Sequence, residues 1–350
     1  MEALLSEIDA VLAEGRIPSI SLNIRVDGRE VFHATRGRAR TVPLREASDD
    51  QAYDLASVTK ALAGTTVLAS LVEEGRLDLD TRVRRWFPQV HPDLEVRHLL
   101  QHSSGWPAWR PFYGGLQATW GTTAARRELL AAVLAVPSEC APGTRHLYSD
   151  IGFLCLLGLA EAETGQRFDA LFLERVLAPA GYPDLRWGWP AAAATELCPH
   201  REILIEGTVH DLNCASIGGV SAHAGLFGTA RGVAALADAL LQATGGASNG
   251  LPGRTLHRLW NTPGPGSHTA GWDRPSEEGY TSTGRFFPRD ARGHLGYTGT
   301  SLWVVPSRSS VIALLTNRVH PVDDKEPIRA ARPRLHDAVA RALGWDRSIA

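Results

Sequence analysis

The stretch Ala56-Ser57-Val58-Thr59-Lys60-Ala61-Leu62-Ala63 places a serine and a lysine three residues apart, at the start of an apolar run that ends near Gly75. Residues three apart on a helix share a face, so this spacing predicts that the Lys60 amine lies beside the Ser57 hydroxyl. A serine in the first turn also lies near a free backbone N–H and the positive end of the helix dipole. We interpret the pair as a nucleophile and its base, with an uncharged amine favoured by the dipole and by burial.

Lys60 is one of only two lysines in a chain with 36 basic residues. Arginine can replace lysine in most solvated roles, but it does not lose its proton in a protein. A lysine that acts as a base must therefore remain lysine, whereas Lys325 follows two aspartates and is interpreted as a solvated surface charge. The alternative interpretation of the Ser57 to Lys60 stretch is a capped helix with a solvated lysine.

The segment Tyr148-Ser149-Asp150 precedes a second apolar run and is typical of a turn that opens a helix. A tyrosine that faces a serine–lysine pair can relay the serine proton to a leaving group. Asp150 can accept from Lys60 or bind a substrate amide. The structural alternatives are N-capping by Asp150 and a buried Tyr148 ring with a satisfied hydroxyl.

The segment Gly293-His294-Leu295-Gly296-Tyr297 lies just before a strand-like run at residues 302–305. Small residues beside a strand allow a substrate to approach the backbone closely, and His294 adds a titratable donor. A tight turn that leads into the strand is the alternative interpretation.

The periodicity of the chain indicates an α+β fold. At the two ends of the chain, the spacing of apolar residues predicts helices at 4–12 and 328–343 and strands at 20–26, 302–305 and 311–315. We interpret these segments as one antiparallel sheet flanked by helices. Residues 81–210 have a helical pattern with few alternating runs. We predict a sheet domain formed by residues 1–80 and 211–350, an inserted all-helical domain at 81–210, and a cleft between them.

Composition excludes several classes of protein. Hydrophobic residues at 44% and charged residues at 21% are typical of a folded chain. A net charge of -2 without a basic cluster argues against nucleic acid or an anionic membrane surface as partner, and favours a small-molecule substrate. The chain has no run of 18 apolar residues, so we expect no membrane span.

Neither a metal nor a cofactor is expected. The four cysteines form no C-x-x-C pair. Six residues could be considered as metal ligands, but their spacings match no familiar zinc pattern: Cys198, His200, His210, Asp211, Cys214 and His223. The N-terminal segment is acidic and does not resemble a signal peptide, so we expect a cytoplasmic protein, or a periplasmic one if the chain was trimmed. The sequence does not indicate an oligomeric state.

In their order and spacing, Ser57-x-x-Lys60, Tyr148-Ser149-Asp150 and His294-Leu295-Gly296 resemble the three signature elements of the penicillin-recognising serine hydrolases. That family includes class C β-lactamases, low-molecular-mass DD-peptidases and family VIII carboxylesterases. The segments 97–105 and 218–227 are also similar to its members, and the likeness covers nearly the whole chain. It implies a β-lactamase/transpeptidase-like fold.

The resemblance also implies a role for each site residue. Ser57 resembles the acyl-accepting nucleophile, Lys60 its base and Tyr148 the proton relay. The backbone N–H groups of Ser57 and Tyr297 would form the oxyanion hole. Substrate binding is expected from Asp150, His294, Gly296 and Tyr297.

Two departures from the family pattern bear on the substrate. Asp150 stands where asparagine is commoner, and His294 stands where many β-lactamases have a lysine that pairs the substrate carboxylate. Both changes disfavour an anionic group nearby, so we expect an ester or a D-amino-acid peptide-like amide as substrate more than a β-lactam. The alternatives are a DD-peptidase or penicillin-binding protein, a weak β-lactamase, and a non-enzymatic penicillin-binding-like sensor or interaction module.

Overall fold

Both ends of the chain contribute to one antiparallel sheet in the computed structural model, which describes residues 1–348. The strand order is β3-β2-β1-β11-β10-β9. The strands are β1 (Ser19–Val26), β2 (Arg29–Arg40), β3 (Arg45–Glu46), β9 (Arg292–Leu295), β10 (Ser301–Val305) and β11 (Ser310–Thr316). The first and last strands pair directly, with Ile24 opposite Ile312. The expected antiparallel sheet is confirmed.

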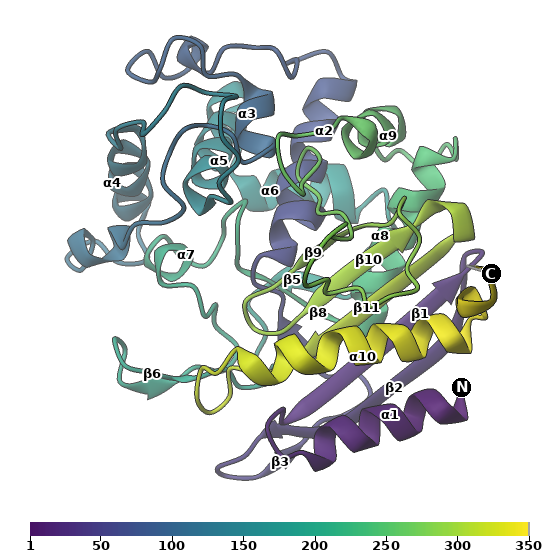
Figure 1. Cartoon of the computed structure of the whole chain (residues 1–350). Coiled ribbons are helices and arrows are strands. Elements are labelled where there is room, and N and C mark those ends of the chain that lie inside the picture. Colours follow the sequence, from purple (N-terminus) through teal and green to yellow (C-terminus); the bar gives the residue numbers. More distant parts are fainter. Residues whose placement is uncertain (349–350) are drawn as a thin grey trace.

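Apolar side chains alternate between the two faces of this sheet. Ile20, Leu22 and Ile24 of β1 pack in one cluster with residues of α1 (Glu2–Ala13) and α10 (Glu326–Ala342). Alternate residues of β11 pack instead in the cluster that contains α8 (Ala230–Thr244). Figure 1 shows α1 and α10 side by side over one face of the sheet, which agrees with the contacts between them.

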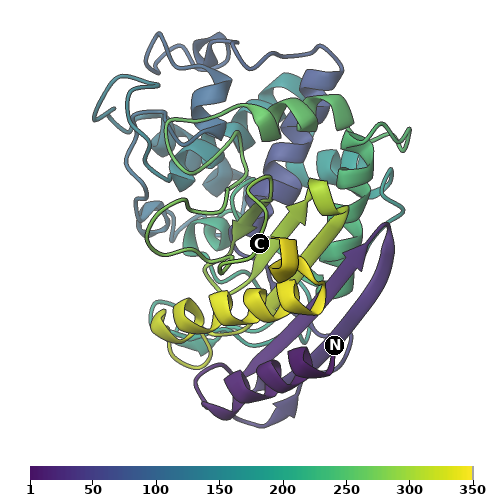
Figure 2. The same ribbon diagram turned by 45° about the vertical axis from the view of Figure 1, so that its right-hand side comes forward.

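The other helices gather at one end of the sheet (Figure 2). They are α2 (Thr66–Glu73), α3 (Val96–Leu100), α4 (Thr123–Leu134), α5 (Asp150–Thr164), α6 (Phe168–Phe172), α7 (Leu212–Ser216) and α9 (Gly253–Asn261). Residues 151–160 of α5 are all buried, so this helix forms the centre of the helical region. Its N-cap is Ser149, whose hydroxyl accepts from the Gly152 N–H, and not Asp150. The Asp150 carboxylate is therefore available for another contact.

The stretch 81–210 is not purely helical, which corrects the expectation of an all-helical domain. It contains β5 (Leu185–Trp187), β6 (Leu197–Cys198) and β7 (Ile203–Leu204). Strands of two or three residues are too short to show alternation in a sequence. β5 joins β4 (Ala52–Asp54) and β8 (Leu226–Thr229) in a small sheet. Within residues 1–348, no helix has both the length and the apolar character that crossing a membrane requires.

Candidate active site

Ser57 lies between β4 and a helical segment, in a turn that is held by a buried carboxylate. Asp54 accepts from the Ala56 N–H at 2.8 Å and from the His210 N–H at 2.7 Å. Ala56 has a φ of 46°, a left-handed conformation that costs free energy for a residue with a Cβ. Ser57 is partly exposed, whereas the residues on either side of it are buried. A constrained turn thus presents the serine to a cleft.

Lys60 lies on the π-helical segment Lys60–Thr65, which continues into α2, and its side chain is fully buried. Its Nζ donates to Ser57 Oγ at 2.9 Å and to the His223 carbonyl oxygen at 3.2 Å. The same Nζ lies 2.6 Å from Asp150 Oδ1. The predicted contact between the serine and the lysine is present. The lysine amine also contacts a carboxylate, that of Asp150.

The expectation of an uncharged Lys60 amine is wrong for the resting site. Burial by itself lowers the pKa of Lys60, but the Asp150 carboxylate and Tyr148 outweigh this effect and raise the pKa above its ordinary value. The sequence argument considered burial and the helix dipole, and it left out the nearby carboxylate. Lys60 therefore rests as an ammonium group paired with Asp150.

Tyr148 lies beside Lys60 and lines the same cleft as Ser57. Lys60 Nζ lies 5.0 Å from the centroid of the Tyr148 ring. Burial raises the pKa of Tyr148, and the neighbouring ammonium of Lys60 opposes that rise. The ring packs against His102, with 4.5 Å between the ring centroids. The tyrosine therefore lies beside the lysine, in the lining of the same cleft as Ser57.

The segment that follows β9 is tied to the turn that carries Ser57. Thr298 Oγ1 donates to the Asp54 carbonyl oxygen at 2.7 Å, and Thr300 Oγ1 donates to that of Leu55 at 3.0 Å. A Cβ on Gly296 would lie 2.0 Å from Thr300 Oγ1 and 2.5 Å from the Leu55 oxygen, so only glycine fits there. These contacts hold Tyr297, which is 42% exposed, at the edge of the cleft.

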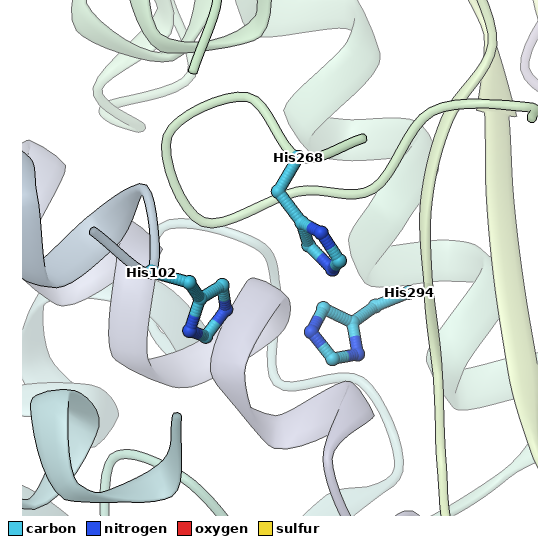
Figure 3. A group of neighbouring side chains, drawn as sticks. All are labelled: His102, His268 and His294. Carbon is cyan, nitrogen blue, oxygen red and sulfur yellow. The ribbon is translucent and has the colours of Figure 1, made fainter. Parts of the chain in front are cut away.

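Three buried histidine rings, His102, His268 and His294, face one another beside Tyr148 (Figure 3). His102 Nδ1 accepts from the Ser149 N–H at 3.0 Å, so its Nε2 carries the hydrogen. His294 Nδ1 donates to the Leu295 carbonyl oxygen at 2.9 Å, so its Nε2 is an acceptor. Burial lowers the pKa of all three rings, to about 4 for His268, and they are neutral near pH 7.

The same three rings are the only group of potential metal ligands within residues 1–348, with ligand atoms within 4.8 Å of one another. An ion bound by all three Nε2 atoms would require the His102 hydrogen on Nδ1, where the Ser149 N–H already points. His102 therefore does not fit as a ligand, and His268 and His294 alone fall short of the usual protein ligand set. No ligand group forms from the cysteines and histidines between 198 and 223.

Ser57, Tyr148 and Tyr297 line two adjoining hollows, of about 710 and about 490 Å³. His294 and Gly296 line the larger one, and Asp150 lines the smaller one. Six of the seven residues expected to form the site thus line these two hollows, and the buried Lys60 contacts Ser57 from beneath them. That arrangement suits covalent attack on a carbonyl group whose two substituents occupy the two hollows.

Comparison with known proteins agrees with this fold. The sequence model of the family described as Beta-lactamase matches residues 4–335. The chain belongs to the β-lactamase family. This β-lactamase-family chain is 29% identical to a "Putative D-alanyl-D-alanine carboxypeptidase" of Escherichia coli (strain K12), in an alignment that covers 88% of this chain and 80% of the relative. It is also 29% identical to an "N-acetylmuramyl-L-alanine amidase" of Bacillus subtilis (strain 168), over 91% of this chain and 81% of that one.

Solved structures of low sequence identity share the fold. The hydrolase EstCE1 aligns with a TM-score of 0.76 at 19% identity, over 97% of this chain and 98% of that one. A family VIII carboxylesterase aligns with a TM-score of 0.74 at 21% identity, over 98% and 97% of the two chains. An octameric penicillin-binding protein homologue from Pyrococcus abyssi aligns with a TM-score of 0.74 at 20% identity, over 97% of this chain and 77% of that one. The expected β-lactamase/transpeptidase-like fold is confirmed.

Sequence reasoning missed several groups that surround the cleft of this β-lactamase-family protein. They are His102, His268 and the cations Arg318 and Arg332. His223, whose carbonyl accepts from Lys60, was considered only as a metal ligand. The missed residues come from separate segments and belong to none of the three signature elements. No spacing pattern in the sequence marks them.

Proposed function

We propose that this protein is a serine hydrolase that forms an acyl-enzyme on Ser57 with carboxylic esters or peptide-like amides. The observation that carries the proposal is the distance of 2.9 Å between Lys60 Nζ and Ser57 Oγ at the edge of an open cleft. The Tyr148 ring and the Asp150 carboxylate both lie beside the same amine. The four groups together provide a nucleophile and a path for its proton.

Proton transfer starts from the paired state of Lys60. The ammonium passes a proton to Asp150 Oδ1, which lies 2.6 Å away, and the resulting amine accepts the Ser57 proton as Oγ bonds to the carbonyl carbon. The Tyr148 hydroxyl then donates its proton to the departing oxygen or nitrogen and recovers one from Lys60. The backbone N–H groups of Ser57 and Tyr297 would stabilise the oxyanion. Water then attacks the acyl-enzyme, and the proton steps run in reverse.

The charge of the cleft supports peptide-like substrates with a carboxylate. His294 supplies no positive charge, but the larger hollow is also lined by Arg318, Lys325, Arg329 and Arg332. Other elements of the fold therefore provide cations near the position where His294 replaces the family's lysine. The names of the relatives, a D-alanyl-D-alanine carboxypeptidase and an N-acetylmuramyl-L-alanine amidase, also favour amide substrates of the cell-wall type.

Mass spectrometry of the intact protein tests the nucleophile. Brief exposure to a fluorophosphonate should add one adduct that maps to Ser57, and Ser57→Ala should abolish both this adduct and p-nitrophenyl ester turnover. Turnover near the parent rate in Ser57→Ala would contradict the proposal. A single equivalent of p-nitrophenol followed by no further release would instead support the sensor alternative.

A further inference from the structure

Ser57 lies between two hollows whose linings carry opposite charge. The smaller hollow is lined by four carboxylates and no lysine or arginine: Asp150, Glu196, Asp211 and Asp323. The larger hollow is lined by four cations against two carboxylates, the cations being Arg318, Lys325, Arg329 and Arg332. Arg318 forms an ion pair with Asp323 of the smaller hollow, so three of these cations remain. We call the smaller hollow the acidic half of the cleft and the larger hollow the basic half. A substrate that spans the nucleophile therefore meets a negative field on one side and a positive field on the other.

The basic half contains a buried guanidinium without a carboxylate partner. Arg332 of α10 is 6% exposed, and among the residues that the structure describes it forms no ion pair. Its Nη2 donates to the Thr300 carbonyl oxygen at 3.4 Å, and its Nε has no partner. Burial lowers the pKa of Arg332 to about 10. A buried cation left unpaired costs free energy, and an anionic group bound in this hollow would offset that cost.

The negative charge that remains in the acidic half lies on Glu196 and Asp211, because Asp150 pairs with Lys60 and Asp323 pairs with Arg318 of the basic half. His210, whose pKa is raised chiefly by Glu196 against its burial, lies 3.1 Å from the Glu196 carboxylate. Asp211 has a pKa lowered to about 2, because His223 and the Cys214 N–H outweigh its burial, so it is ionised at neutral pH.

Two aromatic side chains border the same acidic half, but the ring of Tyr297 already has Arg318 and Lys325 over it and His210 stacked against it. Trp109 and Tyr297 are both 42% exposed and both line this hollow. The faces of aromatic rings attract organic cations within about 6 Å. An ammonium group that enters this half would therefore find carboxylates together with the aromatic surface of Trp109.

On the basis of the function proposed above, we propose that the substrate is a short peptide with both termini free, with its ammonium in the acidic half and its carboxylate in the basic half. The order of charges along a peptide, from the amino to the carboxyl terminus, matches the order of charges across the cleft. The terminal amine lies on the acyl side of the scissile carbonyl and the terminal carboxylate lies on the leaving-group side, so the two charges fall on opposite sides of Ser57. The C–N bond breaks, the Ser57 ester forms, and the amine product takes the proton from Tyr148.

A panel of four dipeptides tests this inference on the unmodified protein. D-Alanyl-D-alanine is compared with its N-acetyl derivative, its C-terminal amide and the doubly blocked compound, and kcat/KM is measured for each. Loss of either charged contact should lower kcat/KM by roughly 10- to 100-fold. Equal values for all four compounds would overturn the inference. If none of the four compounds nor any p-nitrophenyl ester is turned over, the proposed hydrolase function fails instead.

Two variants assign each charge to its half of the cleft. Arg332→Met should remove the preference for a free carboxylate and keep the preference for a free amine, and Glu196→Gln should do the reverse. Arg289→Met and Glu139→Gln are matched controls at exposed positions outside the cleft, and both preferences should persist in them. Unchanged preferences in both cleft variants would contradict the assignment. If Arg332→Met does not fold, the panel on the parent protein still decides the substrate class.

Discussion

The Lys60 Nζ atom lies 2.6 Å from Asp150 Oδ1, and the lysine side chain is fully buried at this contact. A buried ammonium is stable only if a carboxylate or several acceptors compensate it. The aspartate therefore stabilises the charged form of the base, and it is also the nearest acceptor for the proton that the base must lose. This pair links the pH dependence of the proposed reaction to one side chain.

Asp150→Asn should move the acidic limb of the pH profile to higher pH. In the proposed reaction the Lys60 ammonium gives its proton to the Asp150 carboxylate, so the parent protein needs only an ionised carboxylate, whereas in the variant the amine must lose its proton to solvent, at a pH above the ordinary carboxyl range. The measurement is kcat/KM for a neutral p-nitrophenyl ester against pH, where we expect a shift of at least about 1 pH unit. Asp169→Asn, at a partly exposed position on α6 outside the cleft, serves as control. An acidic limb that does not move would contradict the role of the pair.

Tyr148→Phe should affect substrates according to their leaving group. An amine leaves only with a proton, whereas p-nitrophenolate leaves without one. Loss of the hydroxyl, whose ring lies beside Lys60 in the cleft, should therefore reduce kcat for an amide by roughly 10²- to 10⁴-fold, and kcat for a p-nitrophenyl ester by less than about 10-fold. Steady-state kinetics with both substrates measures the difference. Equal losses would show that Tyr148 does not serve as the proton donor to the leaving group.

Gly296→Ala should damage both stability and turnover. The new Cβ would lie 2.0 Å from Thr300 Oγ1 and 2.5 Å from the Leu55 carbonyl oxygen, so the segment that carries Tyr297 must shift. Overpacking of this kind costs about 1–3 kcal/mol in the free energy of unfolding. Gly114→Ala is the matched control, because no neighbouring atom lies within 4 Å of its Cβ position. Denaturant unfolding and ester hydrolysis test both effects, and parent-like values for Gly296→Ala would contradict this account.

Asp211→Asn should lower the free energy of unfolding near neutral pH, and this difference from the parent should disappear in acid. The pKa of Asp211 is lowered to about 2, because contacts with His223 and the Cys214 N–H outweigh burial. A carboxyl group whose pKa falls on folding stabilises the protein above its unfolded pKa of about 4, and this contribution disappears as the pH falls towards 2. Unfolding of parent and variant from pH 7 to pH 2 should therefore give a difference that shrinks between pH 4 and pH 2. Asp9→Asn, on an exposed face of α1, should show no such trend.

Much of the fold was predictable because it follows from local pattern. The alternation of β1 and the apolar runs of β10 and β11 were long enough to identify these segments as strands. The strands β5, β6 and β7 were missed because two or three residues cannot show a period. The contact between Ser57 and Lys60 was predictable because both residues lie on one helical turn.

The sequence by itself determined which groups are adjacent along the chain, since helical and strand geometry fix the neighbours of residues a few positions apart. Only the tertiary structure decided the charge of Lys60 and the opposite signs of the two halves of the cleft. The pKa of a buried amine depends on every charge within several ångströms, and Asp150 is 90 residues from Lys60 in the chain. The cations of the basic half come from the end of β11 and from α10, so packing alone brings them to Ser57.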